Sequence, residues 1–155
     1  MQLKIKNILN IPGESKQFDF IVPEEHLEFV KGYVFHSAVH VTGEIKNHAG
    51  AVVLKLHIEF SLLVTCDRCL KETVQAFSYD TEHIVVRSVQ DEENEENYVI
   101  AKAESIDLAE IAVADLLLEL PSKMLCQEDC KGLCPVCGCD RNVTDCNCMT
   151  KIEFE

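Results

Sequence analysis

The chain has 155 residues, of which 47% are hydrophobic, and a formal charge of −13 from 27 acidic and 14 basic residues. This length and composition provide for one domain with its own core and a small additional segment. They exclude a membrane-spanning protein, because no apolar run approaches the roughly 18 residues that cross a bilayer. They also disfavour bare nucleic acid as the main partner, because the net charge opposes approach to phosphates.

The N-terminal two-thirds is predicted to form antiparallel β-sheet. From Val52 to Val64 every even position is apolar, which is typical of a strand with one buried face. The run from Tyr33 to Ile45 alternates in the same way at odd positions, and residues 46–50 are predicted to form the hairpin loop. Further strands are predicted at Gln2–Ile8, Phe18–Val22, Val74–Tyr79, His83–Val86 and Tyr98–Ala101, and a short helical turn at residues 23–27.

Five of the six residues from Asp91 to Glu96 are acidic. We expect a solvated loop between two strands; the alternative is a docking surface for a basic partner.

One helix is well specified. Asp107 followed by Glu110 fits an N-terminal capping box, and Pro121 ends the helix, which predicts residues 108–120. The predicted fold is therefore α+β. Residues 1–121 form an antiparallel β-rich domain with this helix, and residues 122–155 form a cysteine-rich zinc-knuckle segment docked on it through Cys66 and Cys69.

The chain contains nine cysteines, and seven of them lie between Cys126 and Cys148. Pairs with short gaps let two thiolates reach one zinc ion, and the Cys134-Pro-Val-Cys137-Gly form predicts a tight turn. The predicted cofactor is structural zinc, one or two ions. The eight candidate ligands are Cys66, Cys69, Cys126, Cys130, Cys134, Cys137, Cys146 and Cys148.

Disulfides and redox catalysis are the alternatives for these cysteines. Disulfides need an oxidising compartment, but the N-terminus Met-Gln-Leu-Lys-Ile-Lys has no apolar segment of a signal peptide, so we expect a cytoplasmic protein. Thioredoxin-like chemistry needs one dithiol at a helix N-terminus within a βαβ pattern, which is not evident around Cys66 and Cys69.

Eight cysteines suffice for two four-thiolate sites. The preferred arrangement joins the first four candidate ligands in one site and the last four in the other, whereas a rival arrangement joins Cys66 and Cys69 with Cys134 and Cys137; a single site is the third alternative. Cys139 is left over, because it follows Cys137 by two residues. The tight Cys146-x-Cys148 spacing leaves open whether both of these ligate.

The sequence resembles the YceD family, the large ribosomal RNA subunit accumulation proteins, from about Gly50 to Cys148. The resemblance lies in Cys66-Asp-Arg-Cys69-Leu, Leu120-Pro121, Cys126-Gln-Glu-Asp-Cys130-Lys-Gly-Leu-Cys134-Pro-Val-Cys137-Gly and Cys146-Asn-Cys148. Cys139 and the residues after it depart from the family pattern. The resemblance implies a cytoplasmic protein required for large-subunit rRNA to accumulate.

The predicted function is that of a non-enzymatic zinc-binding factor in large ribosomal subunit biogenesis. Its acidity fits a basic large-subunit ribosomal protein or a pre-ribosomal particle as partner, with any rRNA contact weak and with no membrane contact. The bases near the cysteines are interpreted as offsetting the anionic thiolates, and direct RNA binding is the alternative: Arg68, Lys71, Lys123, Lys131 and Arg141.

A zinc deaminase is the less favoured enzymatic alternative. His57-Ile58-Glu59 lies in a strand-like run, whereas that chemistry needs the pair on a helix and an open position on the metal.

Overall fold

The computed structural model describes residues 1–28, 30–88 and 98–148 and divides the chain into two units. Unit 1 comprises Met1–Leu62 and Ala76–Leu120, and unit 2 comprises Leu63–Gln75 together with the residues from Pro121 onward. The division predicted from the sequence falls between residues 121 and 122. The structure has a boundary one residue earlier and groups Leu63–Gln75 with the C-terminal segment.

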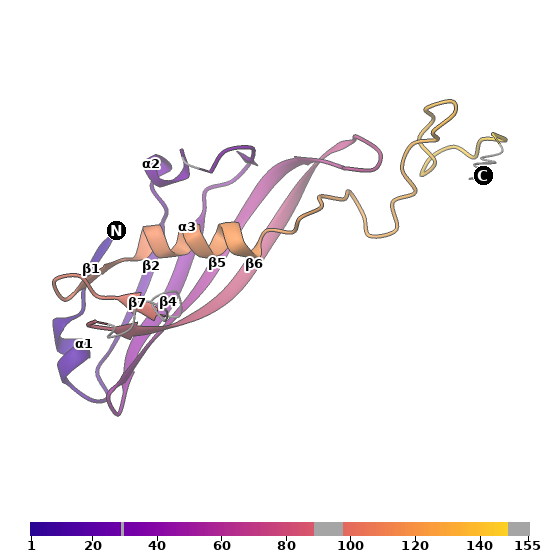
Figure 1. The fold of residues 1–155 in the computed structure, drawn as a ribbon. Helices are drawn as coiled ribbons and strands as arrows, with labels where there is room; N and C mark the ends of the chain where they lie inside the picture. The colour runs from indigo at the N-terminus through magenta and orange to yellow at the C-terminus, as the bar shows by residue number, and fades with distance from the viewer. Residues whose placement is uncertain (29, 89–97, 149–155) are drawn as a thin grey trace. The chain divides into compact units, whose positions relative to one another are not determined.

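The fold is mixed α+β with a mostly antiparallel sheet (Figure 1). Its strands are, in spatial order, β2 (Ser15–Ile21), β4 (His40–His48), β5 (Ala51–Thr65), β6 (Glu72–Val86) and β7 (Tyr98–Ile100), with β3 (Val34–Phe35) also paired to β5.

The pairs β2–β4 and β4–β5 are antiparallel, but β7 runs parallel to β6. The prediction of an antiparallel sheet is therefore wrong at this edge. A parallel pair needs a crossover connection instead of a tight turn. That connection includes the predicted acidic loop Asp91–Glu96, which lies outside the described residues.

The alternation in β5 is confirmed, since every even-numbered side chain from Val52 to Val64 is at most 5% exposed. The two strands predicted at Val74–Tyr79 and His83–Val86 are one strand, β6. The polar residues between the two predicted strands continue the alternation and contact side chains of β5. Glu82 binds Lys55 at 3.1 Å, and Asp80 binds His57 at 2.7 Å.

The β4–β5 hairpin is tighter than predicted. Its turn consists of Ala49 and Gly50, which both have positive φ (52° and 102°), as in the two-residue turns that suit twisted strands. Asn47 stays in the ladder and is 2% exposed. Its Nδ2 donates to the Ile8 carbonyl at 2.7 Å, and its Oδ1 accepts from the Gly50 N–H at 2.7 Å, so it fixes both the turn and the N-terminal segment.

The predicted strand Gln2–Ile8 is wrong beyond Lys4. Strand β1 (Gln2–Lys4) pairs with β8 (Ser105–Asp107), a strand that the sequence analysis missed, and helix α1 (Lys6–Asn10) follows. Ile5 and Ile8 are buried, and a helical turn places residues three apart on one side. The spacing of three residues between Ile5 and Ile8 therefore fits a helical turn and not a strand, in which these two side chains would point to opposite faces.

Helix α3 (Leu108–Glu119) matches the predicted helix 108–120 to within one residue, and the short α2 (Glu24–Leu27) matches the predicted turn. The Asp107 carboxylate caps α3 by accepting from the Ala109 and Glu110 N–H groups at 3.0 and 3.2 Å. It also accepts from the N-terminal ammonium of Met1 at 2.9 Å.

Asp115 connects α3 to the sheet through hydrogen bonds of its side chain. The residue is only 6% exposed. The hydroxyl of Thr81 donates to its Oδ2 at 2.6 Å, and Nε2 of His83 lies 2.7 Å from the same oxygen. Both partners belong to β6, so the helix contacts the sheet through the Asp115 carboxylate. Among the described residues, no buried side-chain nitrogen or oxygen is left without a hydrogen-bond partner.

Candidate metal centres

The turn between β5 and β6 carries Cys66 and Cys69. The Cys66 N–H donates to the Lys71 carbonyl at 2.9 Å, and the Leu70 N–H donates to the Cys66 carbonyl at 2.9 Å. Leu70 has a positive φ of 60°, which closes the turn.

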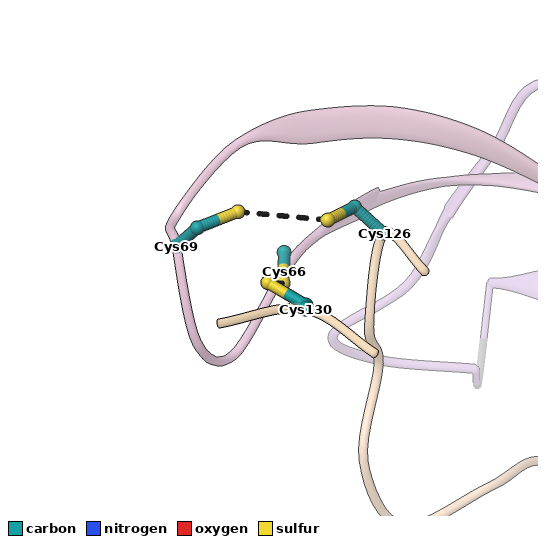
Figure 2. A group of neighbouring side chains, drawn as sticks. All are labelled: Cys66, Cys69, Cys126 and Cys130. Atoms are coloured by element: carbon teal, nitrogen blue, oxygen red, sulfur yellow. Dashed lines mark hydrogen bonds between the residues drawn. The ribbon is translucent and has the colours of Figure 1, made fainter. Parts of the chain in front are cut away.

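Cys126 and Cys130 complete a first cluster, defined as Cys66, Cys69, Cys126 and Cys130 (Figure 2). The figure shows the four side chains converging from the β5–β6 turn and from the segment that follows α3. The sulfurs of Cys66 and Cys130 are 3.7 Å apart, and those of Cys69 and Cys126 are 3.6 Å apart.

Backbone and side-chain hydrogen bonds hold the segment with Cys126 and Cys130 against the turn. Asp67 donates through its N–H to the Met124 carbonyl at 2.8 Å, and its carboxylate accepts from the Met124 N–H at 2.7 Å. The Gln75 side chain donates to the Leu125 carbonyl, and Nη1 of Arg68 donates to the Cys130 carbonyl at 2.8 Å. This explains why residues 63–75 belong to unit 2.

A second turn, Cys134–Cys139, repeats the hydrogen bonds of the first. The Cys134 N–H donates to the Cys139 carbonyl at 2.8 Å, and the Gly138 N–H donates to the Cys134 carbonyl at 2.8 Å. Gly138, with φ of 73°, occupies the place of Leu70, and Cys139 occupies the place of Lys71. The two turns are therefore one conformation used twice.

The second cluster consists of Cys134, Cys137, Cys139 and Cys146, whose sulfurs lie within 4.8 Å of one another. The structure thus places Cys139 among the candidate ligands, whereas the sequence analysis set it aside. Cys148 is not a member of this mutually close set. The structure matches the first group of the preferred arrangement, which joins Cys66 and Cys69 with Cys126 and Cys130, but its second group contains Cys139 where the sequence analysis placed Cys148.

Each cluster contains a sulfur that ionises readily. Burial raises the pKa of Cys66, but the N–H groups of Cys126, Cys69 and Arg68 together outweigh burial and lower the pKa to about 6. The N–H groups of Cys137 and Val136 lower the pKa of Cys134 to about 6. These thiolates provide negative charge for a cation.

The neighbouring thiols hold their protons more tightly. Burial raises the pKa of Cys126 to about 12, and the sulfur of Cys137 raises those of Cys139 and Cys148 to about 12. A cation that binds here would displace those protons.

Asn142, which the sequence analysis missed, connects the first cluster to Asp140, which follows the second turn. Its Nδ2 donates to the Cys130 sulfur at 3.3 Å and to the Asp140 carboxylate at 2.7 Å, while its Oδ1 accepts from the Lys131 N–H at 2.8 Å. Gly132 brings the two turns together: its φ is 72°, and a Cβ there would lie 3.0 Å from the Arg68 carbonyl oxygen.

The sulfur spacing of the first cluster fits a tetrahedral thiolate-bound metal. With metal–sulfur bonds of about 2.3 Å, a regular tetrahedron has sulfurs about 3.8 Å apart. The measured 3.6 and 3.7 Å lie close to that value and far from the S–S bond of about 2.05 Å. All nine cysteines are free thiols.

The residues of the enzymatic alternative have other contacts. His57 lies on β5, where its Nδ1 is 2.7 Å from Asp80 and its Nε2 is 3.6 Å from Glu59. These residues belong to unit 1, whereas both clusters belong to unit 2. In the part of the chain that the structure describes, no helix is long and apolar enough to cross a membrane.

Comparisons with known proteins match the region that holds both clusters. The model of the family described as large ribosomal RNA subunit accumulation protein YceD matches residues 54–154. The chain is also similar to the uncharacterized protein YlbN of Bacillus subtilis (strain 168), with 26% identity over 145 residues that cover 92% of this chain and 84% of YlbN. No solved structure matches the chain significantly.

Proposed function

Since the chain belongs to the YceD family of large ribosomal RNA subunit accumulation proteins, we propose that it is a non-enzymatic zinc-binding factor in large ribosomal subunit biogenesis, acting in the cytoplasm. Family membership supports the role in large-subunit rRNA biogenesis. The observation that carries the proposal is that the family match, residues 54–154, contains both sulfur clusters.

Zinc is the metal that the two clusters fit best. Cysteine thiolates are soft ligands that favour zinc over magnesium or calcium, and tetrahedral four-sulfur sites are typical of structural zinc. Such a site leaves no position for a catalytic water, which supports a non-enzymatic role. The zinc would hold Leu63–Gln75 and the segment from Pro121 together as one unit.

The partner that we propose is a basic large-subunit ribosomal protein, free or within a pre-ribosomal particle. Unit 1 contains 19 acidic and 8 basic residues, so most of the negative charge of the chain belongs to it. Complementary charge accelerates association and favours a basic partner over an acidic one.

Direct binding to RNA is the second candidate, and it rests on the bases of unit 2. Lys71, Lys123, Lys131 and Arg141 are exposed, as phosphate contacts require. Arg68 is exposed as well, but its guanidinium donates to the Cys130 carbonyl, which supports a structural role for this side chain.

Depletion of the protein tests the proposed role. Large-subunit rRNA should fall relative to small-subunit rRNA, and the wild-type chain should restore the ratio better than Cys66→Ser does. An unchanged ratio on depletion would refute the role in biogenesis, and full rescue by Cys66→Ser would separate that role from the first cluster.

Affinity purification from lysate, with and without nuclease, tests the kind of partner. Retention of ribosomal proteins after nuclease treatment is expected if protein contacts carry the interaction. Loss on nuclease treatment, together with loss in Lys131→Glu but not in the control Lys16→Glu of unit 1, would favour RNA binding.

A further inference from the structure

A groove of about 480 Å³ in unit 1 is lined by three lysines, although the unit as a whole is acidic. Lys4 belongs to β1, Lys6 to α1 and Lys16 to β2. Unit 1 has 19 acidic and 8 basic residues, so three of its eight bases line this one groove, together with a single acid, Glu14. Positive charge gathered in a concave surface attracts an anionic ligand.

We propose that this groove binds a small phosphorylated molecule of nucleotide size, whose phosphates contact Lys4, Lys6 and Lys16. Its volume lies within the range of about 300–1,000 Å³ that is usual for small-molecule sites. Asn7 and Ser15 also line the groove and supply neutral donors for phosphate oxygens. The groove belongs to unit 1 and the two sulfur clusters to unit 2, so the inference does not depend on the proposed zinc.

The three lysines are available for such a ligand. Among the residues that the structure describes, neither Lys4 nor Lys16 forms an ion pair with a carboxylate. Lys6 lies 3.7 Å from Glu104, but the two side chains are 71% and 42% exposed, and a pair so open to water contributes little. Ammonium groups around one groove repel one another, and a bound phosphate replaces that repulsion by attraction.

Regular structure holds the backbone of each lysine before any ligand binds. Lys4 pairs with Ser105 in the β1–β8 ladder, and Lys16 pairs with Ile45 in the β2–β4 ladder. Lys6 is the first residue of α1. Only the side chains therefore have to be ordered on binding, which lowers the entropic cost of association.

The charge around the groove favours a small ligand over an RNA strand. Unit 1 has a net charge of −11, with 19 acidic and 8 basic residues, so a strand that extends beyond the lysines approaches other carboxylates. Exposed charges are screened over about 8 Å at physiological ionic strength. A compact phosphate in the groove is therefore influenced mainly by the lysines that line it.

Isothermal titration calorimetry of the full-length chain with ADP as the probe tests the inference. ADP should bind with one equivalent, and adenosine, which has no phosphate, should not bind. Lys4→Ala and Lys16→Ala should each lower the affinity for ADP by about 10-fold or more, because each removes a contact between charged groups. Lys31→Ala is the matched control, since Lys31 is an exposed lysine of unit 1 outside the groove, and it should change the affinity less than about 3-fold.

Glu14→Gln should act in the opposite direction. It removes the one carboxylate that lines the groove and should raise the affinity for ADP by about 2-fold to 5-fold. Failure of ADP to bind, equal binding of adenosine, or losses in Lys4→Ala and Lys16→Ala no larger than in Lys31→Ala would overturn the inference.

Nuclear magnetic resonance of the wild-type chain gives a second test that does not depend on variants. ADP should shift the backbone amide signals of residues 4–8 and 14–16, and shifts confined to other residues would contradict the assignment. A single-stranded RNA oligonucleotide distinguishes the two sources of phosphate, because it should leave ADP bound at equal phosphate concentration. Displacement of ADP by the RNA would make the groove a contact for an RNA backbone and would overturn the inference of a small ligand.

Discussion

Replacing Asn142 by alanine should weaken zinc binding at the first cluster. The variant removes the Nδ2 donor that lies 3.3 Å from the Cys130 sulfur and the Oδ1 acceptor of the Lys131 N–H. A hydrogen bond to a charged group contributes about 1.5–3 kcal/mol, and each 1.4 kcal/mol is a factor of ten. Because sulfur is a weak acceptor, we expect a loss of about 10-fold to 100-fold in affinity, as for other groups that support metal ligands.

Asn142→Asp should cost more than Asn142→Ala, although it has nearly the same shape. It keeps an oxygen for the Lys131 N–H, but it replaces the donor toward Cys130 by a second oxygen and adds negative charge beside a four-thiolate site. Repulsion is then added to the loss of the hydrogen bond.

Competition with a chromophoric zinc chelator measures both effects, in a chain whose second cluster is removed by Cys134→Ser and Cys137→Ser. Asn147→Ala is the matched control, because Asn147 is an exposed asparagine in the same segment. It should change the affinity less than about 3-fold, consistent with the small effects of surface substitutions. Equal affinities of Asn142→Ala and the control, or wild-type affinity of Asn142→Asp, would refute the reasoning.

Two further predictions concern unit 1. Asn47 is 2% exposed, and Asn47→Ala removes its hydrogen bonds to the Ile8 carbonyl and the Gly50 N–H, so the free energy of unfolding should fall by about 2–4 kcal/mol. Urea titrations measure this loss, with Asn7→Ala at an exposed asparagine as the control. The bond to Asp115 raises the pKa of His83, so its contribution to stability is complete below pH 6.5 and is lost as pH rises through the higher folded-state pKa. Urea midpoints across this range should fall less in His83→Gln than in the wild type; His57→Gln, at a more exposed pair, should change the profile less, and an unaltered profile in His83→Gln would contradict the assignment.

The features that could be predicted from the sequence are those with a local periodic signal. The burial of every second residue in β5 and the Asp107 cap of α3 follow from patterns within one element. The parallel pairing of β7 could not be read in this way, because three residues carry no signal for strand direction. The helix α1 was missed because the alternation of Leu3 and Ile5, which belongs to the strand side of the boundary, was extended to Ile8.

The candidate site likewise has features that could be predicted from the sequence and features that could not. Paired cysteines identified both turns, since the spacing within a turn determines which sulfurs can meet. The membership of Cys139 in the second cluster depends on how its backbone pairs with Cys134, and the bond from Asn142 to Cys130 joins residues 12 apart. Such contacts arise from the folded backbone, and the only local signal for Asn142 was a polar residue shortly after a cysteine-rich turn.

During synthesis, the cysteines of the first cluster leave the ribosome far apart in time, whereas those of the second cluster leave it close together. Cys66 and Cys69 leave the ribosome well before Cys126, because 56 residues separate Cys69 from Cys126. At roughly 5–20 residues per second, an exposed dithiol without its partners persists for about 3–11 s. The second turn needs only a few more residues to close. A nascent chain therefore presents one unfinished metal site for seconds, and the supply of zinc during translation becomes relevant to correct folding.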